Sequence, residues 1–163
     1  MKTIINQLFV NNQSIAPLVL RIAAGIIFVA YGAQKLFGAF GGYGLEGTGQ
    51  WMESIGLTPG YLMALAAGSA EFFGGLLLIV GLFTRPTAIV LAFTMFMAIV
   101  TVHLPNGLFM ANNGYAFGLS LLAISLSVAF SGAGRLSFDN IISSKLAHTH
   151  NTHIEKTVNQ VIA

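Results

Sequence analysis

The strongest clue to the architecture lies in residues 61–82, which read YLMALAAGSAEFFGGLLLIVGL. The run has one charged residue, Glu71, and it reaches the length of about 20 residues that a helix needs to cross a bilayer. Its apolar residues are continuous, whereas a half-buried strand or helix of a soluble domain mixes apolar with polar positions at a regular spacing. The sequence therefore predicts a transmembrane helix that carries an acid near its middle.

Three more segments share this character, and they occupy residues 17–37, 86–103 and 115–131. The last of them is the shortest and is rich in serine. Between the second and third spans, Gly81 is suited to end one helix and Thr84 to cap the next, which has Pro86 in its first turn. We therefore predict an all-α protein, a polytopic membrane four-helix bundle.

These spans divide the chain into three parts. Residues 1–16 form an N-terminal segment, residues 17–134 the transmembrane domain, and residues 135–163 a polar tail in water or along the membrane surface. The first span is longer than the apolar core of a cleaved signal peptide, so we expect it to be retained. In the glycine-rich connection that follows it, residues 48–55 are expected to form a short interfacial helix.

The composition of the 163 residues excludes several classes of protein. Charged residues make up 7%, against about 25% in soluble domains, and the mean hydropathy is +0.80. The absence of cysteine excludes disulfides, thiolate catalysis and cysteine-bound zinc or iron–sulfur clusters in this chain. The sequence pI is about 9.2, but the net charge is only +2 and no basic cluster occurs. The expected partner is the lipid bilayer and not nucleic acid.

The distribution of cations predicts the orientation of the spans. Short cytoplasmic segments carry more lysine and arginine than outer ones. With a cytoplasmic N-terminus, Lys35 is the one cation outside, and six lie inside: Lys2, Arg21, Arg85, Arg135, Lys145 and Lys156. Both termini are therefore expected in the cytoplasm, the arrangement N-in/C-in.

Glu71 is the first candidate for a functional residue. An acid at the centre of a membrane helix costs roughly 2.5–3.5 kcal/mol to insert, so it should face protein and find a partner. Its helix face is made of small residues: Ala64, Gly68 and Gly75. The matching stripe of the first span consists of Arg21, Gly25, Phe28, Gly32 and Lys35. We predict that Glu71 meets Arg21, Lys35 or Tyr31, either as a carboxylate that binds a proton or ligand or as a tether that fixes helix register.

Arg21, Lys35 and Gln34 are the other polar residues of the first span. The two cations lie close enough to the interfaces to extend into the headgroups, so each is either a topology anchor or a ligand contact. Gln34 could form a hydrogen bond to another helix.

Histidine is confined to the end of the third span and to the tail. His103 could titrate, ligate a metal or donate to a quinone carbonyl, and the alternative is a capped or solvated helix end. The other three spans have no histidine, so the chain offers no pair of axial ligands for a haem. The tail contains His148, His150 and His153, which could bind a metal. We expect instead a polar tail that binds no metal.

Short motifs follow one another in order along residues 15–140. They are Leu20-Arg21, GAQKLF at 32–37, Gly47-Thr48 through Trp51, AEFFGG at 70–75, GLFTR at 81–85, AIVTVHLPNG at 98–107 and GAGRLSFD at 132–139. Together they resemble the DoxX family of small bacterial membrane proteins. The resemblance implies a multi-pass protein of the bacterial inner (plasma) membrane. It also implies an association with quinone-linked sulfur-compound oxidation, or with membrane redox complexes that work with superoxide- and thiol-handling enzymes.

One position departs from the family pattern. Members often carry a glutamate shortly after the Gly-Tyr that opens the fourth span, but here Gly114-Tyr115 is followed by Ala116. The absence of this glutamate weakens the case for any proton relay that the resemblance would imply.

Three functions remain open from the sequence. The first is an accessory or quinone-binding subunit of a membrane redox complex. In this case the chain alone holds no cofactor, and its partners are other redox subunits or further copies of itself in an oligomer. The second is a non-enzymatic carrier or binder of a small apolar molecule or lipid. The third is a membrane scaffold that recruits soluble partners through residues 143–163.

Overall fold

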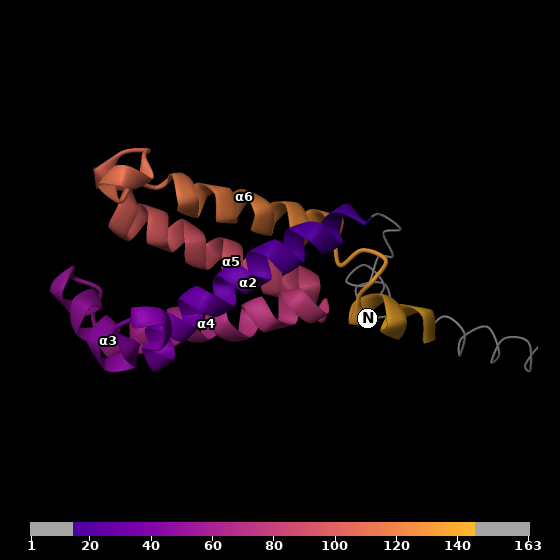
Figure 1. Ribbon diagram of the computed structural model, residues 1–163, viewed down its shortest axis with the longest axis horizontal. Helices are drawn as coiled ribbons and strands as arrows, with labels where there is room; N and C mark the ends of the chain where they lie inside the picture. Colours follow the sequence, from indigo (N-terminus) through magenta and orange to yellow (C-terminus); the bar gives the residue numbers. More distant parts are fainter. Residues whose placement is uncertain (1–14, 146–163) are drawn as a thin grey trace, which may run out of the picture.

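The computed structural model describes residues 15–145, and every regular element in that range is helical (Figure 1). The long helices are α2 (Ala16–Phe37), α4 (Gly60–Val80), α5 (Thr84–Ala98) and α6 (Ala116–Ser131), and α3 (Gly44–Ser54) is a shorter one. Single turns follow α2 and α5: η1 (Ala39–Gly41), the π-helical η2 (Ile99–His103), η3 (Leu104–Asn106) and η4 (Met110–Asn112). A last helix covers residues 138–145.

Three stretches are long and apolar enough to cross a membrane. They are α2, α4 and the continuous helical run Thr84–Asn106, which joins α5 to η2 and η3. The apolar helix α6 has 16 residues and is shorter than these. The prediction of an all-helical membrane protein is confirmed, whereas the number of crossings and the side on which the ends lie stay predictions.

Helices α2 and α4 approach each other so closely that only glycine fits between them. A Cβ atom at Gly25 would lie 2.8 Å from the carbonyl oxygen of Gly75, and one at Gly32 would lie 2.7 Å from Cα of Phe72. Small residues let membrane helices gain van der Waals contact along their backbones. The small-residue stripes predicted for the two spans are therefore confirmed as their shared interface.

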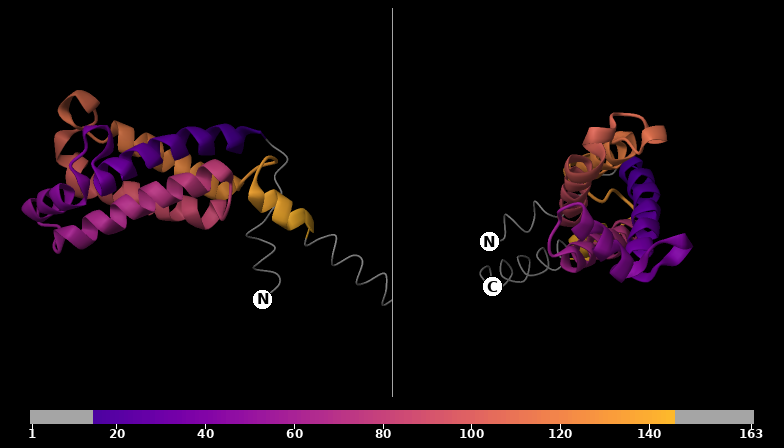
Figure 2. Two further views of the ribbon diagram at one scale, coloured as in Figure 1. Left: turned by 60° about the horizontal axis from the view of Figure 1, so that its bottom comes forward. Right: turned by 90° about the vertical axis from the view of Figure 1, so that its left-hand side faces the viewer.

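The four long helices form two pairs. Seen end-on in Figure 2, they surround a common axis, with α2 beside α4 and α5 beside α6. The buried core between the pairs is apolar and includes Phe28, Leu78, Leu91, Leu121 and Val128. We call the end where α4 passes into α5 the Arg21 end, and the end with α3 and the α5–α6 connection the Lys35 end.

The turn between α4 and α5 is closed by Gly81 and by a residue from the tail. Gly81 ends α4 with φ 71°, a left-handed conformation that glycine adopts readily. Thr84 was expected to cap α5, but it lies inside the first turn of that helix. The Asp139 carboxylate accepts from the amides of Phe83, at 2.8 Å, and Thr84, at 2.9 Å, so it supplies the cap.

Residues 135–139 of the expected tail are therefore part of the bundle. The amide of Asp139 also donates to the carbonyl of Gly81, and the Asp139 side chain is buried. The short helix predicted at 48–55 begins earlier than expected and is α3, which starts at Gly44.

Candidate functional site

Glu71 and Lys35 form an ion pair between α4 and α2. Lys35 Nζ donates to Glu71 Oε2 over 2.5 Å. The glutamate side chain is 4% exposed and the lysine side chain 24% exposed, so the acid is buried and the amine is partly exposed. Gly68, one turn before Glu71, makes room for the lysine, because a Cβ at Gly68 would lie 3.2 Å from Cβ of Lys35. Of the three expected partners of Glu71, the structure brings Lys35 to it.

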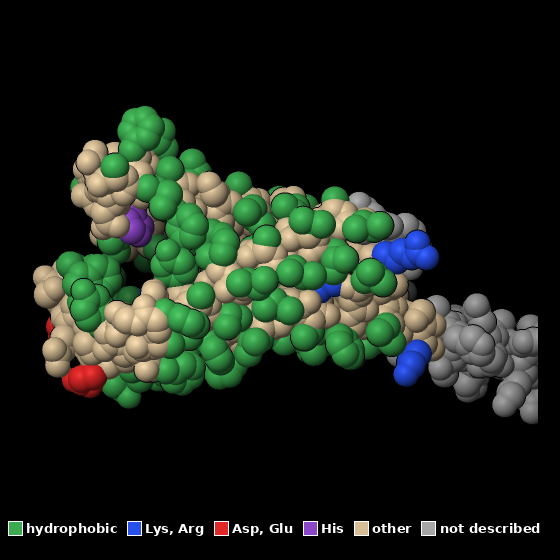
Figure 3. Space-filling model, viewed as in Figure 1, with side chains coloured by type: hydrophobic (Ala, Val, Ile, Leu, Met, Phe, Trp, Pro, Cys, Tyr) green, Lys and Arg blue, Asp and Glu red, His purple; other side chains and the backbone are tan. Residues whose placement is uncertain are grey.

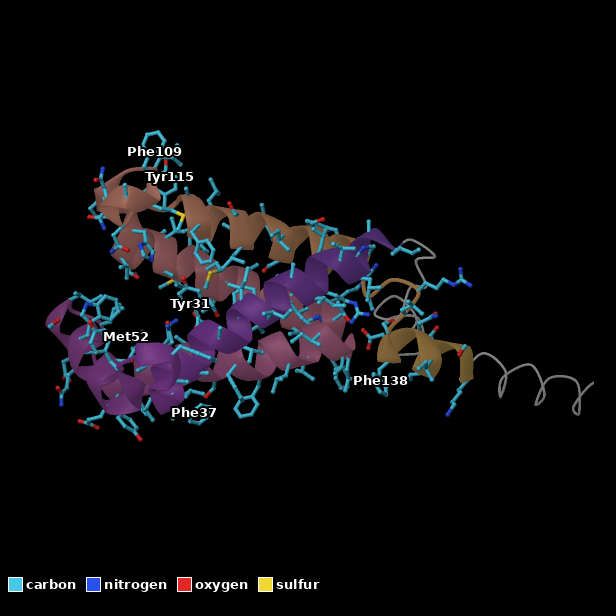
Figure 4. The ribbon with its side chains drawn as sticks, viewed as in Figure 1. Tyr31, Phe37, Met52, Phe109, Tyr115 and Phe138 are labelled. Atoms are coloured by element: carbon cyan, nitrogen blue, oxygen red, sulfur yellow. The ribbon has the colours of Figure 1, made fainter. Side chains whose placement is uncertain are left out.

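Tyr31 lies beside this pair and joins the two helix pairs. The Tyr31 ring centroid lies 5.6 Å from Lys35 Nζ, within reach of a cation–π attraction, and 5.6 Å from the ring of Phe117 in α6. The tyrosine is 44% exposed, and Figure 4 shows it between the α2–α4 pair and the α5–α6 pair. A buried acid, a half-buried amine and a phenol therefore lie together at one place in the apolar bundle.

The surface is hollowed at the Lys35 end of the bundle. Figure 3 shows the hollow between two lobes, one formed by the loop after α2 with α3 and the other by the α5–α6 connection. The purple side chain at the rim of the upper lobe is His103, since it is the histidine within residues 15–145. The ion pair joins α2 to α4, whereas His103 lies at the start of the α5–α6 connection.

His103 ends the π-helical turn η2, and its ring has a fixed hydrogen-bond partner. Nδ1 lies 2.8 Å from the carbonyl oxygen of Asn113, which can only accept, so Nδ1 carries the proton. In the neutral ring Nε2 is then an acceptor with a free lone pair. A neutral His103 in this tautomer can accept a hydrogen bond from a ligand hydroxyl, whereas donation to a quinone carbonyl would need a proton on Nε2 as well.

Arg21 has no contact with Glu71 and lies at the other end of the bundle. Its Nη1 donates to the carbonyls of Leu78, at 3.0 Å, and Ile79, at 2.7 Å, and its Nη2 donates to the carbonyl of Leu136. The side chain is 1% exposed, so it does not extend into the headgroups. Arg21 instead joins α2, the end of α4 and the segment before Asp139.

Gln34 also departs from its expected role. Its Nε2 lies 3.5 Å from the carbonyl oxygen of Phe40, in the turn that follows its own helix, so it forms no bond to a neighbouring helix. No group of three or more metal-ligating side chains occurs in the part of the chain that the structure describes. His148, His150 and His153 lie outside the described residues.

Asp139 is the residue that sequence reasoning missed. It is 5% exposed, both its oxygens accept amide protons at the start of α5, and its charge lies within electrostatic reach of Arg21. A single acid in a polar tail gives no periodic signal. Its one detectable sign is its place in the GAGRLSFD motif at 132–139.

The comparisons with known proteins agree on one family. The chain matches DoxX over residues 16–104. It is 38% identical to "Putative oxidoreductase CatD" of Bacillus subtilis over 78% of this chain and 87% of that protein. Two relatives from Escherichia coli are each 32% identical: inner membrane protein YqjF, over 82% of this chain and 96% of the relative, and inner membrane protein YphA, over 75% and 86%.

No solved structure matches the chain. The family match nevertheless covers more than half of the residues, and three relatives align along most of their own length. Their names place two of them in the inner membrane, which agrees with the three long apolar helices found here. The chain is a membrane protein that belongs to the DoxX family.

Proposed function

We propose that this protein is an accessory subunit of a membrane redox complex that binds a quinone or quinol in the hollow at the Lys35 end. The observation that carries the proposal is the Lys35–Glu71 pair, an amine and a carboxyl group held beside Tyr31 within two helices long and apolar enough to cross a membrane. Charged residues inside membrane spans are costly and mark ligand or proton pathways more often than random positions do. The oxidoreductase name of the Bacillus relative supports a redox setting.

The Lys35 end offers complementary groups to such a ligand. An ammonium has three N–H donors, and the bond to Glu71 uses one, so Lys35 can donate to a ligand oxygen. At the start of the α5–α6 connection, Nε2 of neutral His103 can accept from a hydroxyl. One donor and one acceptor fit a ring with an oxygen at each end, in its reduced, hydroxyl-bearing form. Glu71 holds the lysine in place and can exchange a proton with it.

The single tryptophan of the chain makes this proposal measurable. Trp51 lies in α3, at the Lys35 end, and is 42% exposed. A short-chain quinone titrated into the protein in nanodiscs should quench Trp51 fluorescence in a saturable manner. Glu71→Gln should weaken the apparent affinity about tenfold or more, the equivalent of about 1.4 kcal/mol. Glu53→Gln, an exposed acid of α3, is the matched control and should leave the affinity unchanged.

Unsaturable quenching, or equal affinities for wild type and Glu71→Gln, would remove the pair from this role. A carrier of a small apolar molecule is the second candidate, because the hollow is bordered by apolar side chains and the chain has no cysteine or haem-ligand pair. Uptake of a labelled apolar compound into proteoliposomes, abolished by Glu71→Ala, would favour it. The scaffold hypothesis depends on residues 143–163, most of which lie outside the described part.

Orientation completes the proposal. We infer four crossings with both termini in the cytoplasm, so that the Lys35 end faces outward. The six-to-one distribution of cations supports this arrangement. Reporter fusions at both ends of the chain should report the same compartment, and opposite compartments would contradict it.

A further inference from the structure

The segment 135–145 has one side fixed to the bundle. Ser137 and Asp139 are buried, the Leu136 carbonyl accepts from Arg21, and the Asp139 carboxylate caps α5. The Ser137 hydroxyl donates to the carbonyl of Gly134, which closes the turn before the helix. These bonds hold the segment against the Arg21 end, so the direction of its other side chains is set by the fold.

The opposite side of the segment is apolar and exposed. Leu136 is 62% exposed, Phe138 54% and Ile141 50%, and Phe83 from the α4–α5 turn is 55% exposed beside them in the fold. Figure 4 shows Phe138 pointing away from the bundle. Val80, the last residue of α4, is 42% exposed as well. Exposed apolar side chains therefore occur at the end of α4, in the α4–α5 turn and on this segment.

The charges around this apolar patch are positive. Arg135 and Lys145 are exposed, Arg85 is half-buried, and Figure 3 shows blue side chains at this end of the molecule. Asp139, the acid of this region within the described residues, is 5% exposed, and both its oxygens bond to amides of α5. At the Lys35 end, by contrast, the exposed charges are the acids Glu46 and Glu53.

From this arrangement we propose that Phe83, Leu136, Phe138 and Ile141, with Arg85, Arg135 and Lys145, form a binding surface for anionic phospholipid headgroups. The apolar side chains enter the boundary between headgroups and acyl chains, and the cations meet the lipid phosphates. The exposed apolar residues at the end of α4 and in the α4–α5 turn, next to a span that is apolar enough to cross a membrane, favour lipid over a soluble protein. The proposal is independent of any quinone at the other end.

The chain has no cysteine, so single cysteines can be introduced for spin labels without removing native ones. Labels at Phe138→Cys and Ile141→Cys should be shielded from a water-soluble nickel chelate and accessible to oxygen in nanodiscs that contain phosphatidylglycerol. A label at Asn112→Cys, an exposed position of the α5–α6 connection at the other end of the bundle, is the control and should stay accessible to the chelate. Labels at Phe138 and Ile141 that are open to the chelate with every lipid would overturn the proposal and leave the patch to a protein partner.

A second set of measurements, in which the charge of the lipid and of the protein is changed, distinguishes headgroup binding from simple apolar contact. Shielding at Ile141→Cys should be weaker in phosphatidylcholine alone, and it should fall as salt is raised. The same label should then be measured in a protein that also carries Arg135→Gln and Lys145→Gln. Each cation near an anionic surface contributes about a fivefold factor to the binding equilibrium. The ratio of shielded to accessible label should therefore fall by about fivefold for each cation removed. Both residues are exposed, so the fold should persist, which circular dichroism can verify. Shielding that ignores both the lipid charge and these substitutions would overturn the headgroup contact.

Discussion

The two ends of the bundle hold their buried charges in different ways. At the Arg21 end, a guanidinium that is 1% exposed bonds to three backbone carbonyls, from α4 and from the segment before Asp139. At the Lys35 end, where the surface is hollowed, an amine that is 24% exposed bonds to a carboxylate side chain. A charge bonded to backbone carbonyls is part of the fold, whereas a partly exposed side-chain pair can exchange a proton or a partner. Substitutions at the Arg21 end should therefore chiefly lower stability, whereas substitutions at the Lys35 end should chiefly weaken ligand binding.

The largest loss of stability should come from breaking the Arg21 end. Arg21→Met leaves the three carbonyls without their donor and Asp139 without its counter-charge. Removing one partner of a buried charge network costs about 3–5 kcal/mol. Unfolding by a titration with sodium dodecyl sulfate, followed by Trp51 fluorescence, measures this free energy. Arg135→Met, an exposed cation nearby, should change it by no more than about 0.5 kcal/mol, and equal effects of the two would contradict the comparison.

The second prediction tests whether the close packing of α2 against α4 supports both ends of the bundle. Gly32→Val would place Cβ 2.7 Å from Cα of Phe72, a backbone atom that cannot give way cheaply. We expect a loss toward the upper part of the range of about 1–3 kcal/mol for overpacking. Ala23→Val, on the exposed side of the same helix, is the control. The same detergent titration applies, and a harmless Gly32→Val would show that α2 and α4 are less closely packed than described.

A smaller change isolates the cap at the Arg21 end. Asp139→Asn keeps the shape of the side chain but replaces one acceptor oxygen by an NH₂ group, which cannot accept from Phe83 or Thr84. We expect a loss of about 0.5–2 kcal/mol, as for other helix caps. Amide hydrogen exchange should accelerate at the start of α5 and stay the same at the start of α4. Unchanged protection at Thr84 would exclude Asp139 as the cap.

The smallest effect on stability is expected where the proposed ligand site lies. Glu71→Gln keeps an oxygen that can accept from Lys35, and the lysine side chain is partly exposed already. The loss should be about 0.5–1.5 kcal/mol, comparable to one hydrogen bond. A double-mutant cycle with Lys35→Gln measures the coupling of the pair. A loss as large as that of Arg21→Met would make the pair a structural tether and weaken the ligand proposal.

The sequence predicts the Lys35 end better than the Arg21 end, and the reason is physical. An acid at the centre of a span must find a partner, and helical spacing limits the partners to a few residues of α2, among them Lys35. The glycine stripes follow from the same spacing. Because these rules act within regular helices, they can be applied before any tertiary contact is known.

The Arg21 end depends on contacts that no spacing rule contains. Arg21 bonds to carbonyls, which every residue has, so its partners leave no sign in the sequence. Asp139 caps a helix that lies more than 50 residues earlier in the chain, and the local rule pointed to Thr84 instead. Gln34 could have reached another helix, but its Nε2 lies 3.5 Å from the carbonyl oxygen of Phe40, in a turn that helical spacing does not predict.

The close fit of α2 and α4 affects how far the hollow can open. These two helices are locked to each other along their glycines, and the two helix pairs are joined through Arg21 and Asp139 at one end. A helix of 22 residues, such as α2, is about 33 Å long. Because of this length, a rotation of the two pairs by about 5° about the joined end would separate their opposite tips by about 3 Å. Such a rotation would change the width of the mouth by about the diameter of a water molecule, and it would have to separate Tyr31 from Phe117, which join the two pairs near this end.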